Sequence, residues 1–583
     1  MGRFEETDIL VIGSEGAGAR AALEAAERGL RVLVASKGVI GKSGATLTSG
    51  ADVSVDSRSA IELFGLPGNP EDSPERFAED MCRESGYISN QALVKIHCEE
   101  APARIRELAD WGLKISHLTQ APGHQYPRGL WVAGTEFPKV FASRFKKQDR
   151  VSVLDNFMVT DLLTHKGRVA GACGLRVTTG EFLAVKARAV IICAGGAMRI
   201  YPHATAPDEL TGDGMAMALR AGAALVDMEF PMFLPYTMIK PASIDGLDFT
   251  YSLLTYLEGH ALNRLGERYM KHWDPERMER STRDINSVAA MMQVLEGKGS
   301  PNGGTYVSLA HIPQNLLEYS AEWFPSDMSG WRYSGFNMRN FLPDLTKEAV
   351  ETAPAAHFWN GGIRINEKCE TSLPGLFAAG EGTGGLMGAN RISGNALTMT
   401  QVWGRRAGVY AAQYAQGCDD VQIEKDQTGQ FEYDIESLLT REKGYEAVRT
   451  RRDLQKLAWE SIGVIREESG LTGVLGVLAD MKRNVLPNIK VSTTARACNR
   501  EWVEAIQLRN MALIIEAVAL SSLERTESRG ALYRCDHTKT DNLSWLKNIV
   551  LEKRENGLST RQVGANILYH KPEAGVFRYG YKG

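Results

Sequence analysis

The sequence predicts an α/β protein in which a long insertion interrupts a parallel sheet and a helical region follows it. Three observations indicate this arrangement. A strand, a glycine-rich turn, a helix and a second strand follow one another within the first 40 residues. Two further apolar strands end in small residues and lie far apart in the chain, at residues 187–192 and 375–380. Between residues 421 and 525, charged and apolar side chains alternate at helical spacing with few glycines.

The first of these features is a βαβ unit, typical of Rossmann-like dinucleotide-binding domains. Residues 8–12 are an apolar run, residues 19–29 have helical composition, and residues 30–35 form the second strand. Glycines in the turn allow the backbone to approach a pyrophosphate at the helix N-terminus, where free N–H groups favour anions. A tight turn without a ligand is the structural alternative. The candidate cofactor-binding residues of this turn are Gly13, Ser14, Glu15, Gly16, Ala17 and Gly18.

Two departures from the general dinucleotide fingerprint narrow the choice of cofactor. Glu15 occupies the position of the second glycine and brings a carboxylate to a phosphate site, so Gly16 is expected to provide the close approach instead. The second strand ends in Ser36 and Lys37, where the fingerprint has an acid for the ribose hydroxyls. This argues against an ordinary NAD site and leaves FAD open.

The two distant strands predict the rest of the same sheet. The strand at 187–192 leads into Ala194, Gly195 and Gly196, and the strand at 375–380 is followed by Glu381. Between them, Asp213 opens a helix over residues 215–221 and is a further candidate for phosphate or ribose contact.

Composition excludes several classes of protein. The 583 residues correspond to three or four domains at roughly 100–200 residues each. With 71 acidic and 67 basic residues the net charge is −4, which argues against a nucleic-acid binder. No apolar run is long enough to span a membrane directly, and the acidic N-terminus does not resemble a signal peptide. The 8 cysteines form no C-x-x-C pair, so we expect no metal or iron–sulfur site in this chain and a reducing, cytoplasmic location.

Motifs along nearly the whole chain resemble the flavoprotein subunit of the succinate dehydrogenase/fumarate reductase family. They occur in the family's order: the turn at 13–18, residues 211–214, 262–270, 357–363, 379–381, 388–391 and 527–531. The resemblance implies a Rossmann-like FAD-binding domain interrupted by an α+β capping domain, then a helical domain and a short C-terminal segment. The expected ranges are 1–232 and 353–420 for the FAD-binding domain and 233–352 for the capping domain. The helical domain is expected over 421–540 and the C-terminal segment over 541–583.

The resemblance also implies that FAD is bound non-covalently. The family's covalent branch carries a flavin-linked histidine where this chain has Gly44. Loss of that bond is expected to lower the flavin potential and to favour electron delivery to substrate. Further cofactor-binding residues implied by the family motifs are Ser43, Gly44, Ala45, Thr46, Arg391, Asn395, Ala396 and Leu397.

Four residues match the family's catalytic positions. Arg283 corresponds to the arginine that transfers a proton, with Glu267 as a proton-relay partner. His357 and Arg391 correspond to the residues that bind a carboxylate, and an arginine fork suits bidentate carboxylate binding. The structural alternatives are a helix-capping Arg283–Asp284 pair and a structural histidine before the Gly-Gly turn.

The substrate pocket departs from the family. Leu234 stands where the family has a histidine for a second carboxylate, and its Thr-Glu pair has no clear counterpart. The residues expected in the pocket are Leu234, Thr255, Tyr256, Glu258 and Trp359. We therefore expect the substrate to be an α,β-unsaturated acid (enoate) with one recognised carboxylate. The enzyme would reduce its C=C bond or form that bond in the reverse dehydrogenation. Fumarate or succinate is the alternative.

Electrons are expected to come from a separate iron–sulfur or other redox subunit, through which the chain could lie peripheral to a membrane. The sequence leaves open homo- or hetero-oligomers, and reoxidation by O₂ as in L-aspartate oxidases. It also leaves open a different chemistry of the adenylylsulfate reductase or L-aspartate oxidase type, and a flavoprotein that only relays electrons.

Overall fold

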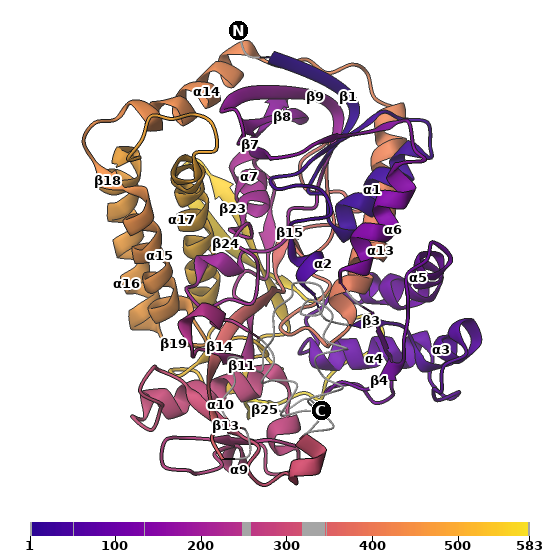
Figure 1. The fold of residues 1–583 in the computed structure, drawn as a ribbon, viewed down its shortest axis with the longest axis vertical. Helices are drawn as coiled ribbons and strands as arrows, with labels where there is room; N and C mark the ends of the chain where they lie inside the picture. The colour runs from indigo at the N-terminus through magenta and orange to yellow at the C-terminus, as the bar shows by residue number, and fades with distance from the viewer. Residues whose placement is uncertain are drawn as a thin grey trace.

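The computed structural model describes residues 3–49, 52–132, 134–247, 258–317, 344 and 347–580. Three bodies are visible in Figure 1: a nucleotide-binding domain around the main sheet, a capping domain below it, and a group of long helices on the left. This arrangement confirms the expected fold class.

The nucleotide-binding domain is built on a seven-stranded sheet of order β6-β2-β1-β9-β8-β7, with β16 beside β9. The predicted βαβ unit is present as β1, α1 and β2, and the two strands are parallel. β9 pairs antiparallel with β8 along its first half and parallel with β16 at its end, so one sheet is assembled across the insertion. The sheet elements are β1 (Arg3–Ile12), α1 (Gly16–Ala26), β2 (Val32–Ala35), β6 (Val151–Leu154), β7 (Phe157–His165), β8 (Arg168–Arg176), β9 (Glu181–Ile192), β16 (Leu376–Ala378) and α13 (Asn395–Gln416).

The sheet strands are apolar because helices cover them. Ile9, Leu10 and Val11 of β1 are fully buried, and α1 packs against α13. The remaining elements of this domain are α2 (Ala45–Thr48), β3 (Asp52–Ser54), α3 (Ser57–Phe64), α4 (Pro74–Glu84), α5 (Gln91–Asp110), β4 (Leu118–Thr119), β5 (Gly129–Trp131), α6 (Glu136–Phe145), α7 (Asp213–Ala221), β10 (Leu225–Val226), β15 (Gly362–Arg364) and β17 (Thr383–Gly384).

The capping domain contains a four-stranded sheet of order β11-β14-β13-β12 with α10 packed against β11. Its last strand ends at Trp359, beyond residue 352, because β14 remains paired with β11 up to that residue. Its elements are β11 (Pro231–Met238), β12 (His260–Leu262), α9 (Met270–Trp273), α10 (Arg283–Leu295), β13 (Thr305–Ser308) and β14 (Val350–Trp359).

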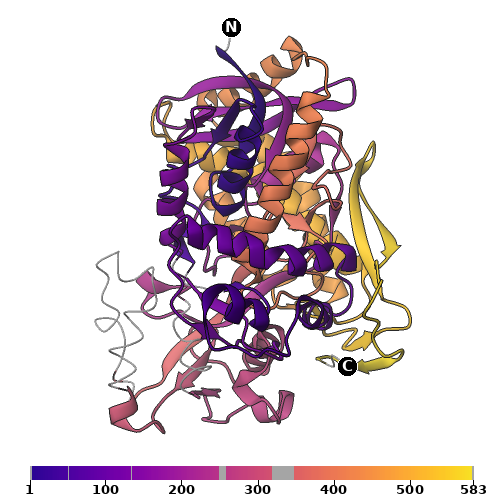
Figure 2. The same cartoon turned by 90° about the vertical axis from the view of Figure 1, so that its right-hand side faces the viewer.

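The C-terminal segment is not a separate body. The hairpin of β23 and β24 joins β10, β15 and β17 in a five-stranded sheet, and Figure 2 shows it running along one side of the molecule. The C-terminal strands are β21 (Tyr533–Arg534), β22 (Lys539–Asp541), β23 (Lys547–Arg554), β24 (Gly557–Gly564) and β25 (Val576–Arg578).

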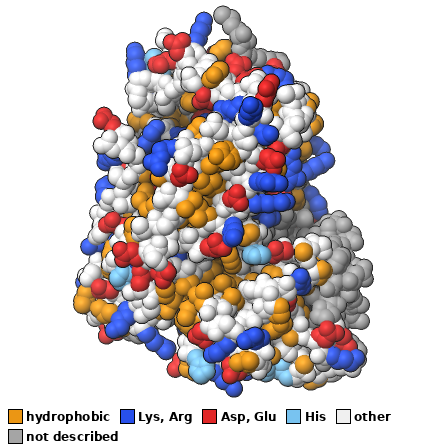
Figure 3. Space-filling view, turned by 90° about the vertical axis from the view of Figure 1, so that its left-hand side faces the viewer, with side chains coloured by type: hydrophobic (Ala, Val, Ile, Leu, Met, Phe, Trp, Pro, Cys, Tyr) orange, Lys and Arg blue, Asp and Glu red, His pale blue; other side chains and the backbone are white. Residues whose placement is uncertain are grey.

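Four helices form the helical region: α14 (Lys425–Thr440), α15 (Ala447–Ile462), α16 (Glu468–Asp480) and α17 (Arg500–Glu524). Short strands accompany them at β18 (Tyr445–Glu446), β19 (Ile465–Arg466) and β20 (Ile489–Lys490). On the face that carries α15 and α16, acidic and basic side chains are interspersed with apolar ones (Figure 3). In the described part of the chain, no helix combines the length and the apolar character needed to cross a bilayer.

Candidate active site

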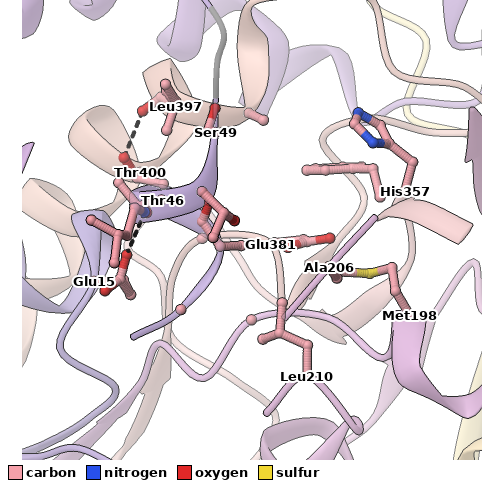
Figure 4. Close-up of a pocket in the computed structure, with 18 of the residues that line it drawn as sticks. Glu15, Thr46, Ser49, Met198, Ala206, Leu210, His357, Glu381, Leu397 and Thr400 are labelled. Carbon is pink, nitrogen blue, oxygen red and sulfur yellow. Dashed lines mark hydrogen bonds between the residues drawn. The ribbon is translucent and has the colours of Figure 1, made fainter. Parts of the chain in front are cut away.

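A cavity of about 1380 Å³ lies between the nucleotide-binding domain and the capping domain. In Figure 4, Glu15 and Thr46 lie on one side of it, His357 lies on the opposite side and Glu381 lies between them. The sheet contributes the glycine turn, the capping domain contributes Arg283 and Leu234, and the loop before α13 contributes Arg391. The cavity therefore spans most of the predicted cofactor-binding residues and three of the predicted catalytic residues.

The turn after β1 and the first turn of α1 each accept only glycine at one position. Gly13 has a φ of +106°, and a Cβ there would lie 2.1 Å from the carbonyl oxygen of Cys193. A Cβ at Gly18 would lie 1.9 Å from the carbonyl oxygen of Gly13. These contacts bring the start of α1 against the strand ends, which leaves its N-terminal N–H groups beside the cavity for a pyrophosphate. Ser14 and Ser36 join the tips of β1 and β2 through hydroxyl groups 2.8 Å apart.

Lys37 and Asp213 form an ion pair at the end of β2. The Lys37 ammonium donates to the Asp213 carboxylate and to the carbonyl oxygen of Glu209, both at 2.6 Å. Burial raises the pKa of Asp213, but the Lys37 charge and the hydrogen bonds from Asn510 and Gln507 outweigh it and lower the pKa below its usual value. An acid from α7 therefore lies at the end of β2, where the dinucleotide fingerprint has one.

Glu15 and Gly44 fit together. A Cβ at Gly44 would lie 2.3 Å from Cγ of Glu15, so a side chain at residue 44 would displace the Glu15 side chain. The Glu15 carboxylate accepts a hydrogen bond of 3.2 Å from the N–H of Leu47. Burial raises the pKa of Glu15 to about 7, with the charge of Glu209 adding to the effect and the hydrogen bonds opposing it. Glu15 and Gly44, which both depart from the family pattern, are thus in close contact: the Glu15 side chain fills the space that a side chain at residue 44 would need.

Glu15 is expected to make cofactor affinity depend on pH. As the pH rises through about 7, Glu15 ionises beside the helix N-terminus that receives the phosphates, and the like charge weakens binding. We expect FAD to bind the apoprotein roughly five- to tenfold more weakly at pH 8 than at pH 6, measured by quenching of flavin fluorescence. Glu15→Gln should lose this difference. An equal pH dependence in both proteins would assign it to another group, such as Glu381.

The other predicted cofactor residues surround the same space. Those that line the cavity are Ser43, Gly44, Ala45, Thr46, Ala194, Gly195, Glu381, Ala396 and Leu397. Gly16, Gly196 and Asn395 lie behind this lining: Gly16 donates its N–H to the Thr46 hydroxyl at 3.3 Å, and Asn395 contacts His97 at 2.9 Å. Burial raises the pKa of Glu381 to about 7, against the hydrogen bond from Trp359 N–H and the charge of Arg391.

Arg283, His357 and Arg391 converge on the cavity. Arg283 is the first residue of α10 and donates to the Ser393 hydroxyl at 3.2 Å. The Arg391 guanidinium lies over the Phe358 ring, 4.5 Å from its centroid. His357 Nδ1 is 2.8 Å from the Thr205 hydroxyl, and burial together with the two arginine charges holds the pKa of His357 well below its usual range. The structure thus brings three of the four predicted catalytic residues together.

Glu267 is the exception. Its side chain is exposed, accepts a hydrogen bond of 2.8 Å from Asn263 and does not line the cavity. The turn at 263–267 folds back on itself because Asn263 also accepts from the Glu267 N–H at 3.1 Å. The prediction of Glu267 as a relay beside Arg283 was wrong for this reason.

Only some of the residues predicted for the substrate pocket line the cavity. Leu234 lines the cavity. Trp359 is fully buried behind it and contributes its backbone N–H to Glu381 at 3.0 Å. Glu258 is exposed and pairs with Arg280 at 2.6 Å, so neither Trp359 nor Glu258 is a pocket-lining residue. Thr255 and Tyr256 lie outside the described residues.

Sequence reasoning missed several cavity residues. Their positions depend on long-range packing, and no local motif marks them. They are Asp52, Gln120, His124, Arg277, Arg280 and Ser393.

Comparison with known proteins agrees with this geometry. Residues 8–397 match the FAD binding domain family, and residues 451–576 match the fumarate reductase flavoprotein C-terminal family. The chain is 34% identical over 562 residues to one of the subunits of fumarate reductase (CoM/CoB) from Methanothermobacter marburgensis, covering 94% of this chain and 97% of that protein. It is 29% identical to the succinate dehydrogenase flavoprotein subunit of Coxiella burnetii, covering 94% of each.

A solved structure supports the same assignment. Mycobacterium smegmatis Sdh1 in complex with UQ1 superposes with a TM-score of 0.85 at 31% identity, covering 96% of this chain and 94% of that one. The glycine cradle, the matched families and this superposition identify FAD as the cofactor. The chain belongs to the fumarate reductase/succinate dehydrogenase flavoprotein family and is an FAD-dependent oxidoreductase acting on CH–CH groups.

Proposed function

We propose that this protein reduces the C=C bond of an α,β-unsaturated monocarboxylic acid, or catalyses the reverse dehydrogenation. The observation that carries the proposal is the convergence of Arg283, His357 and Arg391 on a cavity that Leu234 also lines. Arg391 and His357 can bind one carboxylate, and Arg283 can transfer one proton. An apolar leucine cannot pair with a second carboxylate, whose burial beside it would cost several kcal/mol.

Arg391 and His357 bind the substrate carboxylate in this proposal. The Phe358 ring supports the Arg391 guanidinium, which presents a fork suited to a bidentate contact. His357 is neutral because of its lowered pKa, so it supplies a hydrogen bond and no further charge. Both groups would polarise the carboxylate and stabilise the negative charge that develops on it during reduction.

Arg283 is the proton donor in the direction of reduction. Bound FAD supplies the two-electron chemistry through hydride exchange at N5. One carbon of the double bond receives the hydride, and Arg283 delivers the accompanying proton to the neighbouring carbon. Ser393 holds the Arg283 guanidinium toward the cavity. In the reverse direction the same nitrogen accepts the proton.

The flavin is held non-covalently in this proposal, and its electrons come from a partner. Gly44 has no side chain to bond the flavin, and its Cβ position is already filled by Glu15. Relatives of this chain are named as subunits, and this sequence has no C-x-x-C pair for a cluster of its own. We infer that a separate iron–sulfur or other redox subunit exchanges electrons with the FAD.

Fumarate reduction is the second candidate. It is supported by the names of the relatives and by Arg283 and Arg391, two of the four arginines that line the cavity, which could each engage a carboxylate. The two candidates differ in whether a second carboxylate improves or impairs turnover.

A substrate panel separates these candidates. With reduced viologen as donor under anaerobic conditions, we expect enoate monocarboxylates such as aryl acrylates to be reduced with a kcat/KM at least about tenfold above that for fumarate. Product analysis should show the saturated acid. Faster turnover of fumarate would select the second candidate, and no reoxidation by any acid would reject both.

A further inference from the structure

Thr205 is held by its backbone beside the strand that carries His357. The segment at 203–205 runs parallel to β14, with Ala204 opposite Ala356. The N–H of Ala356 donates to the carbonyl oxygen of His203 at 2.9 Å, and the N–H of Thr205 donates to the carbonyl oxygen of Ala356 at 3.0 Å. Because His357 is the next residue of β14, these two hydrogen bonds fix where the Thr205 side chain begins relative to the His357 ring.

The Thr205 side chain contacts that ring directly. Its hydroxyl oxygen lies 2.8 Å from Nδ1 of His357 and has no second hydrogen-bond partner among the described residues. Both residues line the cavity, and Figure 4 shows His357 at one side of it. In the same part of the chain no side chain or backbone group bonds to Nε2 of His357, so Nε2 is the ring nitrogen left for a ligand.

The contact with Thr205 favours one tautomer of His357. The ring is neutral, because burial and the charges of Arg283 and Arg391 hold its pKa well below its usual range, so it can donate from only one nitrogen. With the proton on Nε2, Nδ1 accepts a hydrogen bond from the Thr205 hydroxyl and Nε2 is free to donate. With the proton on Nδ1, the hydroxyl proton has no acceptor among the described residues, and Nε2 presents a lone pair to an anionic ligand.

Resting on the proposed function, we propose that Thr205 is a positioning residue that holds His357 with its Nε2–H toward the substrate carboxylate. The hydrogen bond at Nδ1 decides which nitrogen carries the proton. It also holds the ring against rotation about its Cβ–Cγ bond, a broad torsion that is otherwise easily turned. Thr205 therefore acts on the substrate through His357.

The test measures carboxylate binding to the oxidised holoprotein by isothermal titration calorimetry, with propionate, cinnamate and succinate as ligands. Thr205→Val keeps the shape of the side chain and removes its hydroxyl, so we expect it to weaken about tenfold each of these acids that the wild type binds. Thr205→Ser keeps the hydroxyl and should remain within about threefold of the wild type. Equal losses in Thr205→Val and Thr205→Ser would assign the effect to packing of the threonine methyl group and overturn the proposal.

A double-mutant cycle separates an effect through His357 from a direct contact. His357→Ala removes the ring, so adding Thr205→Val to it should weaken binding by no more than about a further twofold. A further tenfold loss in the double variant would show that the Thr205 hydroxyl binds the ligand itself, and the positioning role would be wrong.

Thr237→Val is the matched control for the loss of a buried hydrogen bond. Thr237 lies on β11, does not line the cavity, and donates its hydroxyl to the carbonyl oxygen of Ala353 on β14 at 2.8 Å. This variant should lower the unfolding temperature at least as much as Thr205→Val does and leave carboxylate affinity unchanged. If it weakened binding as much as Thr205→Val, the effect would belong to the strand and the proposal would fail.

Failure of this proposal can be told apart from failure of the proposed function. Equal affinities in the wild type and in Thr205→Val overturn only the role of Thr205. If the wild-type holoprotein binds none of the three acids, the proposed function itself fails.

Discussion

Replacement of Arg283 by alanine is expected to lower the rate of enoate reduction by about 10³-fold, because a positioned proton donor contributes 10²- to 10⁴-fold to such a reaction. The residue extends from the start of α10 into the cavity that also contains Arg391 and His357. FAD should stay bound, since the glycine cradle lies on the sheet and not on the capping domain. Turnover is measured with reduced viologen, and FAD content by absorbance.

Two further variants test whether the loss of rate comes from the Arg283 guanidinium itself. Arg264→Ala removes an exposed arginine of the same domain and should retain full activity. Arg283→Lys keeps the positive charge but changes the reach and geometry of the donor, so it should recover substrate binding and little of the rate. Full turnover in Arg283→Ala would remove this guanidinium from the mechanism. Loss of FAD in the same variant would indicate a structural role instead.

Much of the cofactor site could be predicted from sequence because its determinants are local. The turn at 13–18 lies between a strand and a helix, and its glycines are required by contacts within that unit and with the adjacent strand end. The parallel pairing of β9 and β16 was also predictable, since two buried apolar strands with small residues at their ends suit neighbouring positions in one sheet.

The positions of Glu267 and Asp52 could not be predicted in the same way. Glu267 lies in a family motif, yet the local turn with Asn263 directs it to the surface. Asp52 lies in no motif, and its place in the cavity lining depends on the pairing of β3 with β5 and on the close approach of Gly394. The Lys37–Asp213 pair likewise joins residues of two separate elements. Each of these placements depends on tertiary contacts that sequence spacing does not reveal.

Gly18→Ala is expected to weaken FAD binding strongly although it adds a single methyl group. That Cβ would lie 1.9 Å from the carbonyl oxygen of Gly13 and 3.3 Å from Cβ of Cys193. Because the nearest atom belongs to the backbone, the start of α1 must move away from the strand ends, which misplaces the N–H groups that receive the phosphates. Overpacking of this kind costs about 1–3 kcal/mol, which corresponds to a dissociation constant for FAD weakened by up to about 10²-fold.

Gly429→Ala is the matched control for this substitution. Gly429 lies in α14 with no atom within 4 Å of its Cβ position, so the added methyl group meets open space. Alanine is favoured over glycine in helices by up to about 1 kcal/mol, so this variant should keep its FAD and unfold at the same or a slightly higher temperature. Flavin absorbance relative to protein absorbance after gel filtration measures FAD retention, and a thermal melt measures the unfolding temperature. If Gly18→Ala retained FAD as well as Gly429→Ala does, close packing of α1 against the β1 turn would not be what forms the phosphate site.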